Sequence, residues 1–348
     1  SFFYLYKPNF QLIMIFQNTI IEWYHKNKRD LPWRNTTDPY KVWISEIILQ
    51  QTKVSQGLPY YNRFITEFPT ITDLANAKED QVLKLWQGLG YYSRARNLHF
   101  TAKYIMQHYN GTFPSSYLEI LNLKGVGVYT AAAISSFCFN LPYAVVDGNV
   151  IRFLSRLFGV ETAFNTAEGV KIFRELAQNL LDKNIPGEYN QAIMEFGALH
   201  CTSKSPKCYA CSFASNCTAY ITNSIAIFPV KVRKISLKKR FLDYLLIQKG
   251  NSIMLRKRHS GIWNGLYEFP FLESEHEKSS DLIISSDVWV NFFNNSSYKV
   301  ESISKSFTHR LSHQYIYARF WKVHVQEFTL DNCFFVRNRE LKNYPVPR

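Results

Sequence analysis

Residues 121–149, LNLKGVGVYTAAAISSFCFNLPYAVVDGN, decide the fold of this chain because they join two candidate sites. The first is the turn of Gly125 and Gly127, which separates two helical patterns where a tight hairpin needs unusual backbone torsions. Amides at the start of the second helix make a phosphate site that reads no base. The second site is Asp147, which follows an apolar pair and heads the next helix. Each feature alone is more typical of an ordinary turn or an N-cap.

The composition favours a basic protein of two domains. The 348 residues, 46% of them hydrophobic, suffice for two cores. A formal net charge of +14 indicates a polyanionic partner, with nucleic acid ahead of an anionic membrane. No apolar run approaches the ~20 residues that a membrane-spanning helix needs. We therefore expect a cytoplasmic protein, in which residues 1–13 form an extension without the features of a secretion signal.

A buried carboxyl group is predicted on a helix running from Tyr40 to about Val54. Asp38 and Pro39 provide an N-cap and a first-turn proline for this helix. Glu46 shares its helix face mostly with apolar residues. Desolvation should then raise its pKa and keep it protonated near neutrality, which is the condition for a general acid. The alternative is a hydrogen-bonded core glutamate, although fully buried glutamates are rare.

Two further stretches carry groups that can contact bases. Gln50 and Gln51, expected on the same helix, can donate and accept hydrogen bonds at base edges, although glutamine is also common on helix surfaces. Residues 88–96, GLGYYSRAR, predict a second helix-turn-helix with aromatic rings and arginines at the turn. Such rings can wedge beside bases, and the alternative for Tyr92 is packing in its own core.

Four cysteines predict a metal centre. Cys201, Cys208, Cys211 and Cys217 follow the spacing C-x6-C-x2-C-x5-C within seventeen residues. Such a group is better explained by a metal ion or a cluster than by disulfides in a cytosolic chain. Structural zinc and an iron-sulfur cluster both take four cysteines, so these residues alone leave that choice open.

The sequence changes character after residue 221. Residues 229–240 are rich in Lys and Arg, contain no acid, and predict a linker between domains. Strand-like runs over residues 241–248, 252–258 and 315–325 predict a small α+β domain. Residues 307–313 are expected as a polar loop before the last of these strands. Because no carboxylate lies among its two histidines, base or phosphate contact ranks above metal binding.

Together these motifs resemble the MutY-type adenine DNA glycosylases of the helix-hairpin-helix superfamily, over nearly the whole chain. The resemblance implies an all-α catalytic region with a [4Fe-4S] cluster, followed by an α+β Nudix-like domain. The family removes adenine mispaired with 8-oxoguanine. The motifs that carry the resemblance are Leu31-Pro32-Trp33, residues 45–52 (SEIILQQT), residues 88–92 (GLGYY), Gly125-Val126-Gly127, residues 146–149 (VDGN) and the four cysteines.

The resemblance also implies domain boundaries. Residues 14–222 would form the catalytic region, in which a six-helix module of about 36–145 is inserted into an iron-sulfur module formed by 14–35 and 146–222. Residues 223–239 would be the linker, and residues 240–348 the lesion-recognition domain.

Matched residue by residue, Glu46 resembles the general acid of the family, and Asp147 resembles the carboxylate that stabilises or traps the oxocarbenium-like sugar. Two carboxyl groups of opposite protonation state are what a retaining glycosidase needs. Tyr129 and Asn149 resemble the supports of that aspartate. The remaining assignments that the resemblance implies are base contacts at Arg29, Trp33, Gln50, Gln51, Tyr91, Gln191, Ser312 and His313, and DNA-backbone contacts at Lys124, Gly125, Val126 and Gly127.

Within this group Arg29, Trp33 and Gln191 would line the pocket of the extruded adenine, because the target bond cannot be reached inside a duplex. Gln51 and Tyr91 would fill the gap and wedge beside the oxidised guanine. The cysteines Cys201, Cys208, Cys211 and Cys217 would hold the [4Fe-4S] cluster, and the hairpin could bind a monovalent cation. The implied partner is duplex DNA with an adenine to 8-oxoguanine mispair, bound by a monomer.

Three residues refine the expectation. Tyr129 stands where bifunctional relatives place a Schiff-base lysine, and a phenol cannot form that adduct, so we expect a monofunctional enzyme. Lys124 replaces the usual proline of the hairpin, and Leu311 replaces the usual phenylalanine before Ser-His. No glutamate cluster of a Nudix hydrolase is found over residues 261–295, so the C-terminal domain should recognise rather than hydrolyse. The alternatives are an endonuclease III-like pyrimidine glycosylase and lyase, and a lesion-binding protein without catalysis.

Overall fold

The computed structural model describes residues 10–232, 237–294, 296–311 and 313–347. Its chain forms two compact units, residues 1–76 with 97–233, and residues 77–96 with 234–348. The first unit is helical in its described part, and the second is built on a sheet, which confirms the predicted order of an α region followed by an α+β domain. No helix within the described ranges has the length and apolar character needed to span a bilayer.

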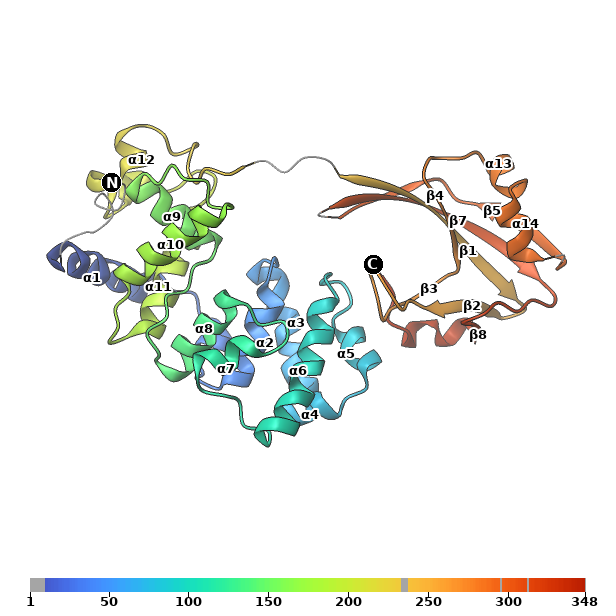
Figure 1. The fold of residues 1–348 in the computed structure, drawn as a ribbon, viewed down its shortest axis with the longest axis horizontal. Helices are drawn as coiled ribbons and strands as arrows, with labels where there is room; N and C mark the ends of the chain where they lie inside the picture. Colours follow the sequence, from blue (N-terminus) through green and yellow to red (C-terminus); the bar gives the residue numbers. More distant parts are fainter. Residues whose placement is uncertain (1–9, 233–236, 295, 312, 348) are drawn as a thin grey trace. The chain divides into compact units, whose positions relative to one another are not determined.

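The described part of the first unit consists of helices joined by turns and loops of varied length (Figure 1). In chain order they are α1 (Phe10–Asn27), η2 (Pro32–Arg34), α2 (Pro39–Leu49), α3 (Val54–Glu67), α4 (Ile71–Asn76), α6 (Ser93–Tyr109, which begins in the second unit), α7 (Tyr117–Asn122), α8 (Val128–Phe139), α9 (Gly148–Phe158), α10 (Ala167–Leu180), α11 (Pro186–Leu199), η3 (Cys208–Ala210), η4 (Ala214–Asn216) and α12 (Thr218–Ile221).

The predicted start of α2 is confirmed and its predicted end is wrong. The Asp38 side chain accepts a hydrogen bond from the Tyr40 amide, and Pro39 occupies the first turn. The helix ends at Leu49, and Gln51 takes a positive φ of 55°. Gln50 and Gln51 therefore lie in the turn between α2 and α3, because a left-handed residue cannot continue a right-handed helix.

The hairpin between α7 and α8 needs one of its two glycines for its backbone torsion. Gly125 has a φ of 84°, and a Cβ there would lie 2.8 Å from the Asn97 Cβ, so only glycine fits. Gly127 instead has an extended φ of −99° as the N-cap of α8, and a Cβ there would meet nothing within 4 Å. The prediction of an unusual torsion is thus wrong for Gly127.

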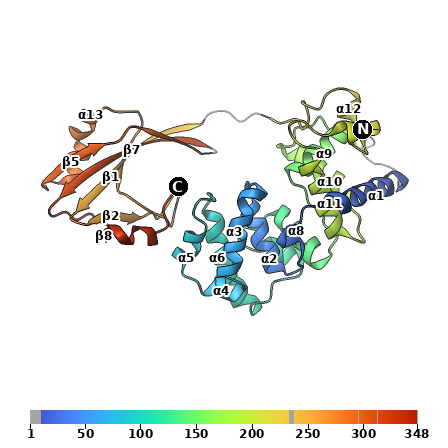
Figure 2. The ribbon, with the colours of Figure 1, turned by 180° about the vertical axis from the view of Figure 1, so that it is seen from behind.

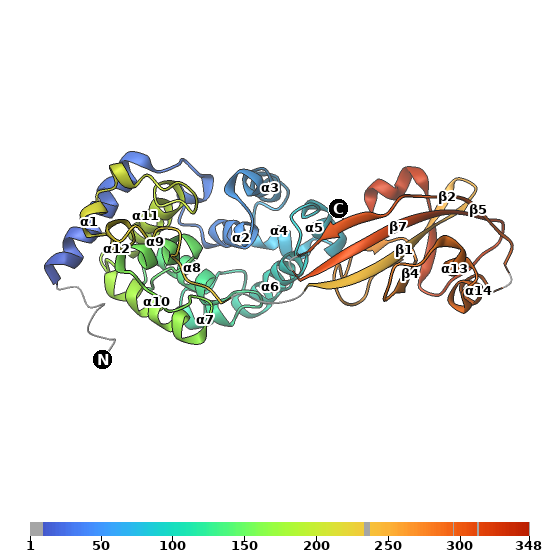
Figure 3. The same ribbon diagram turned by 90° about the horizontal axis from the view of Figure 1, so that it is seen from above.

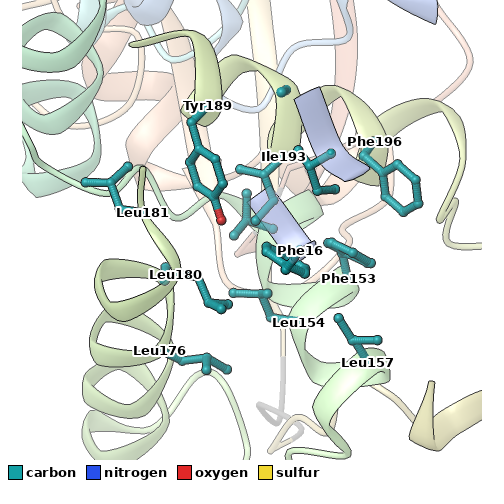
Figure 4. Packing of buried hydrophobic residues seen from close by; sticks show 14 of the residues in the cluster. Phe16, Phe153, Leu154, Leu157, Leu176, Leu180, Leu181, Tyr189, Ile193 and Phe196 are labelled. Atoms are coloured by element: carbon teal, nitrogen blue, oxygen red, sulfur yellow. The ribbon is translucent and has the colours of Figure 1, made fainter. Parts of the chain in front are cut away.

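The main core of the first unit joins α1 to helices from the second half of the unit. Figure 4 shows Phe16 of α1 beside Phe153 of α9, with Ile193 and Phe196 of α11 packed near them. The rings of Phe16 and Phe153 are stacked with centroids 6.0 Å apart. Because α1 and α11 share this core, residues that are more than 160 positions apart in sequence are brought into one site.

In its described residues the second unit is built on an eight-stranded sheet whose main path runs through residues 267–268 (β3), 252–257 (β2), 238–249 (β1), 314–325 (β7) and 298–303 (β5). Its long strands β1 and β7 run parallel side by side, with Leu242 opposite Ala318 (Figure 3). Trp289 of α14 packs on Trp321 of β7 and covers one face. The elements are α5 (Glu79–Leu85), β1 (Lys238–Lys249), β2 (Ser252–Lys257), β3 (Tyr267–Glu268), β4 (Phe271–Ser274), α13 (Ser280–Ile284), α14 (Asp287–Phe293), β5 (Tyr298–Ile303), β6 (Phe307–Arg310), β7 (Gln314–Val325), β8 (Cys333–Arg337) and η5 (Asn338–Asn343).

The expected polar loop over residues 307–313 is partly a strand, so that prediction is corrected. Residues 307–310 form β6, which pairs antiparallel with β7 so that Arg310 lies opposite Tyr315. The Leu311 amide donates to the Gln314 carbonyl oxygen at 2.8 Å and closes a tight hairpin. Ser312 lies outside the described residues, and His313 is exposed at the tip. The phenylalanine and threonine of this stretch support cross-strand pairing, a signal that outweighs its polar appearance.

Candidate active site

A cavity of about 170 Å³ in the first unit brings together most of the predicted site residues. Helices α2 and α8 pack against each other at this site, and α3 lies on the other side of α2 (Figure 2). The predicted residues that line it are Arg29, Trp33, Glu46, Tyr129, Asp147, Asn149 and Gln191. Gln50 and Gln51 lie outside this lining. Residues not predicted to line it are Leu31, Arg34, Val42, Ser45, Leu49, Thr52, Val54, Phe137, Met194, Glu195 and Ala198.

Glu46 is a buried carboxyl group on an almost entirely apolar helix face. Its side chain is carried by α2, and the residue is only 6% exposed. Burial raises the pKa of Glu46 and the nearby charge of Asp147 adds to the rise, while a hydrogen bond with Tyr129 and the charge of Arg34 oppose it, and the net pKa is about 7. Near neutrality this group can therefore either give or take a proton.

Asp147 is both the N-cap of α9 and a wall of the cavity. Its Oδ1 accepts hydrogen bonds from the amides of Asn149 and Val150, at 2.8 and 2.7 Å. The Asn149 side-chain amide donates to Oδ2 at 2.7 Å. Burial raises the pKa of Asp147, while these three hydrogen bonds and the charge of Arg152 oppose the rise. The capping contacts thus favour the ionised carboxylate and fix its orientation.

Arg152 links this carboxylate to the cysteine loop. Its Nη2 donates to the Asn149 Oδ1 at 2.9 Å, and its Nε donates to the Cys201 carbonyl oxygen at 2.8 Å. The start of α9 also approaches α11 closely, because a Cβ on Gly197 would lie 2.6 Å from the Asn149 carbonyl oxygen. The position of Asp147 therefore depends on contacts on two sides.

Glu195 and Arg34 form a charged wall of the cavity that sequence reasoning did not assign. The Arg29 Nε donates to the Glu195 Oε1 at 2.8 Å, and the Arg34 Nη2 donates to Oε2 at 2.8 Å. Burial opposes the ionisation of Glu195, but the two guanidinium groups outweigh it and lower the pKa to about 2. Glu195 lies four positions after Gln191 on α11, and this helical spacing was the one available signal that it faces the same cavity.

The hairpin residues form a separate surface at the start of α8. Lys124 and Gly127 are exposed, and the Thr101 hydroxyl fixes the turn by donating to the Lys124 carbonyl oxygen at 2.9 Å. The Lys124 Nζ lies 4.3 Å from the centroid of the Phe100 ring. The first amides of a helix have no partner within it, so α8 directs hydrogen-bond donors outward beside a cation.

The remaining predicted base contacts lie on the surfaces of the two units. In the first unit Gln51 is exposed, while the Gln50 side chain donates to the Thr130 hydroxyl at 3.4 Å. In the second unit Tyr91 is 48% exposed, with a positive φ of 47°. Tyr92 is buried, and its hydroxyl accepts a hydrogen bond from the Gly88 amide, so the core alternative holds for Tyr92.

The four cysteines line one cavity in the first unit, next to Arg156. The Arg156 Nη1 lies 3.5 Å from the Cys201 Sγ. A single zinc ion needs its ligands to converge to ~2.3 Å from one point. Among the described residues, no group of three or more His, Cys, Asp or Glu side chains is arranged to hold a metal ion. By ligand type the four cysteines could hold either a zinc ion or an iron-sulfur cluster, since both take four thiolates.

Comparison of the sequence with protein families finds two matches. Residues 44–180 match the HhH-GPD superfamily of base excision DNA repair proteins, and residues 243–348 match the NUDIX domain. The chain is 39% identical to an adenine DNA glycosylase of Buchnera aphidicola subsp. Baizongia pistaciae, over 87% of this chain and 84% of the relative. The adenine DNA glycosylase of Homo sapiens is 40% identical over 60% of this chain and 40% of its own length.

Solved structures resemble the helical part of the chain. A thermostable thymine-DNA glycosylase superposes with a TM-score of 0.56 at 31% identity, covering 60% of this chain and 97% of its own. A non-covalent endonuclease III-DNA complex superposes with a TM-score of 0.54 at 20% identity, covering 62% and 98%. The helical helix-hairpin-helix fold followed by a Nudix-like domain is thereby confirmed.

Proposed function

Because this chain belongs to the adenine DNA glycosylase family, we propose that it excises adenine from duplex DNA, and that its target is adenine mispaired with 8-oxoguanine or guanine. The observation that carries the proposal is the pair of carboxyl groups in one cavity, Glu46 with a raised pKa and Asp147 capped by amides. A duplex keeps the glycosidic bond out of reach, so the adenine would be flipped into this cavity. The enzyme would act in the cytoplasm, on nucleoid DNA.

Glu46 is the proposed general acid. Its protonated form donates to a ring nitrogen of adenine, which makes the base a better leaving group. As the glycosidic bond breaks, the sugar gains oxocarbenium character, and the Asp147 carboxylate stabilises or traps it. Glu46, now ionised, takes a proton from the water that completes hydrolysis. Tyr129 and Asn149 hold the two carboxyl groups in place through the hydrogen bonds described above.

The proposed adenine pocket combines a buried ring with fixed donors and acceptors. Trp33 is 7% exposed and is held edge-on by Tyr61, so it can pack against a planar base. Arg34 and Gln191 donate to ring nitrogens of adenine, and the ionised Glu195 holds the Arg34 guanidinium in place. Arg29 keeps Glu195 ionised, because its two side-chain hydrogen bonds are the largest influence that lowers the pKa.

DNA binding is proposed for surfaces on both units. Lys124, Gly125, Val126 and Gly127 would form a phosphate site at the start of α8, where the first helix amides and the Lys124 cation face outward, and the carbonyl groups of this turn could bind a monovalent cation. Gln50, Gln51 and Tyr91 would fill and wedge the gap left by the flipped base. Ser312 and His313 would read the oxidised guanine, with Leu311 beside them in place of the phenylalanine that the family usually has. The protein would act as a monomer.

Cys201, Cys208, Cys211 and Cys217 would hold a [4Fe-4S] cluster. When bound, the cluster would crosslink the loop between α11 and α12, next to Arg156. The cluster would stabilise the position of Asn149 in the cavity, because Arg152 donates hydrogen bonds both to the Cys201 carbonyl oxygen and to the Asn149 side chain.

Strand cleavage without alkali is not expected from this site. Tyr129 occupies the position from which a lysine would form a Schiff base, and no lysine lines the cavity in the part of the chain that the structure describes. We therefore propose a monofunctional enzyme.

Single-turnover incubation with a duplex that carries adenine opposite 8-oxoguanine tests the proposal. Wild type should give strand breaks only after alkali, while Glu46→Gln and Asp147→Asn should give none. Breaks without alkali would instead support the lyase alternative. Tight duplex binding by wild type without adenine release would support a non-catalytic lesion-binding protein.

A further inference from the structure

Tyr24 lies behind the cavity and makes a hydrogen bond to one of its lining residues. It belongs to α1, is 3% exposed, and is not among the residues that line the cavity. Its hydroxyl donates to the Gln191 Oε1 at 2.8 Å. The Arg34 guanidinium carbon lies 5.8 Å from the centroid of the same ring. One buried phenol therefore contacts two of the polar groups that face the proposed adenine site.

The surroundings of the phenol decide which way the Gln191 amide points. A buried tyrosine hydroxyl needs an acceptor for its proton. The carboxylate of Glu195 is already engaged, since Arg29 and Arg34 donate to both of its oxygens. The amide oxygen of Gln191 is then the remaining acceptor, and the Gln191 Nε2 is turned away from Tyr24. Because Gln191 lines the cavity, this amino group is a donor available to a bound base.

This orientation gives the cavity a defined hydrogen-bond pattern. Gln191 and Arg34 both present donors to a bound base. Adenine complements the pattern, because its ring nitrogens N1, N3 and N7 are bare acceptors. Guanine and hypoxanthine also have bare N3 and N7, but they carry an N–H at N1, so a donor that faces N1 would meet another donor.

We propose that Tyr24 is a positioning residue for base specificity: by occupying the Gln191 Oε1 it holds the amide donor toward the base and so selects adenine over purines with a protonated N1. The proposal rests on the proposed function and adds a residue that does not touch the substrate. Without the phenol hydroxyl, the Gln191 amide can turn over and present its oxygen to a ring N–H.

The test compares single-turnover release of adenine and of hypoxanthine, each opposite 8-oxoguanine, by the full-length protein with its cluster. For Tyr24→Phe, the ratio of the adenine rate to the hypoxanthine rate should fall about 2- to 10-fold, the range of one neutral hydrogen bond. Gln191→Leu should lower the ratio by itself, and adding Tyr24→Phe to it should change the ratio no further.

Tyr40→Phe is the matched control. Tyr40 is also a buried phenol of the first unit, and its hydroxyl donates to the Phe68 carbonyl oxygen at 2.7 Å, but it does not line the cavity. This variant should leave the ratio unchanged. If Tyr24→Phe slows both substrates equally, Tyr24 only supports packing and the proposal is overturned.

A second measurement separates this proposal from the proposed function. Calorimetric titration with free adenine and free hypoxanthine measures the affinity of the cavity for each base without turnover. Wild type should bind adenine in preference to hypoxanthine, and Tyr24→Phe should lose that preference. If wild type keeps the preference but releases no adenine from DNA, the enzymatic function fails while the role of Tyr24 stands. If wild type shows no preference in either measurement, the role of Tyr24 is refuted.

Discussion

The raised pKa of Glu46 should make the folded protein less stable as the pH rises. Burial raises this pKa from its ordinary value of 4.5 to about 7. Between these values the folded chain keeps a proton that the unfolded chain has lost, so stability is intact below about pH 4.5 and falls as the pH rises through 7. The shift corresponds to a loss of about 3 kcal/mol at pH 8. Glu46→Gln removes this titration, so it should abolish adenine release and yet stabilise the folded protein at pH 8.

Urea unfolding at two pH values measures the effect. The stability gain of Glu46→Gln over wild type should be about 2–3 kcal/mol larger at pH 8 than at pH 5, with an unchanged denaturant slope. Glu67→Gln is the control, because this carboxyl group of α3 is exposed in the same unit. The stability difference between Glu67→Gln and wild type should be the same at pH 5 and at pH 8. An equal gain for Glu46→Gln at pH 5 and pH 8 would refute the reasoning, because an amide that only packs better carries no pH dependence.

Three further perturbations have defined outcomes. Tyr129→Phe removes a hydrogen bond that lowers the Glu46 pKa, so the alkaline limb of single-turnover adenine release should move to higher pH. Gly197→Ala should destabilise by about 1–3 kcal/mol in urea unfolding and slow adenine release, because its Cβ would lie 2.6 Å from the Asn149 carbonyl oxygen. Cys211→Ala should lower the iron content and the visible absorbance, together with the unfolding midpoint.

Each of these outcomes can fail separately. An alkaline limb that moves to lower pH in Tyr129→Phe would mean that the phenol stabilises the protonated carboxyl group. Full activity in Gly197→Ala would mean that the start of α9 can shift without displacing the Asp147 carboxylate. Unchanged iron content in Cys211→Ala would remove this residue from the proposed cluster ligands.

The parts of the fold that sequence reasoning predicted are those that local chemistry determines. Asp38 before Pro39 placed the start of α2, and the apolar neighbours of Glu46 placed it in a buried position. Asp147 was expected either as a cap or as a catalytic group, and the structure gives it the cap contacts at the wall of the cavity. Local signals sufficed there because an N-cap and its acceptors lie within three residues of each other.

The parts that sequence reasoning missed depend on distant contacts. The ion pairs of Glu195 with Arg29 and Arg34 join residues 166 and 161 positions apart, and no local pattern indicates them. The end of α2 was placed too late because Gln51 has no sequence feature of a left-handed residue. Its positive φ is a tertiary effect, since helix propensity alone permits glutamine to continue the helix.

The same hydrogen bonds support both the capping and the catalytic interpretation of Asp147. A carboxyl group in a buried cavity is driven toward protonation, as the raised pKa of Glu46 shows. For two such groups to act as acid and carboxylate, one must receive donors that the other lacks. At the start of α9 the backbone supplies two of them to Asp147, and Asn149 supplies a third. A helix N-terminus therefore gives the asymmetry that the proposed chemistry requires, and it explains why the proposed catalytic carboxylate stands where a cap would stand.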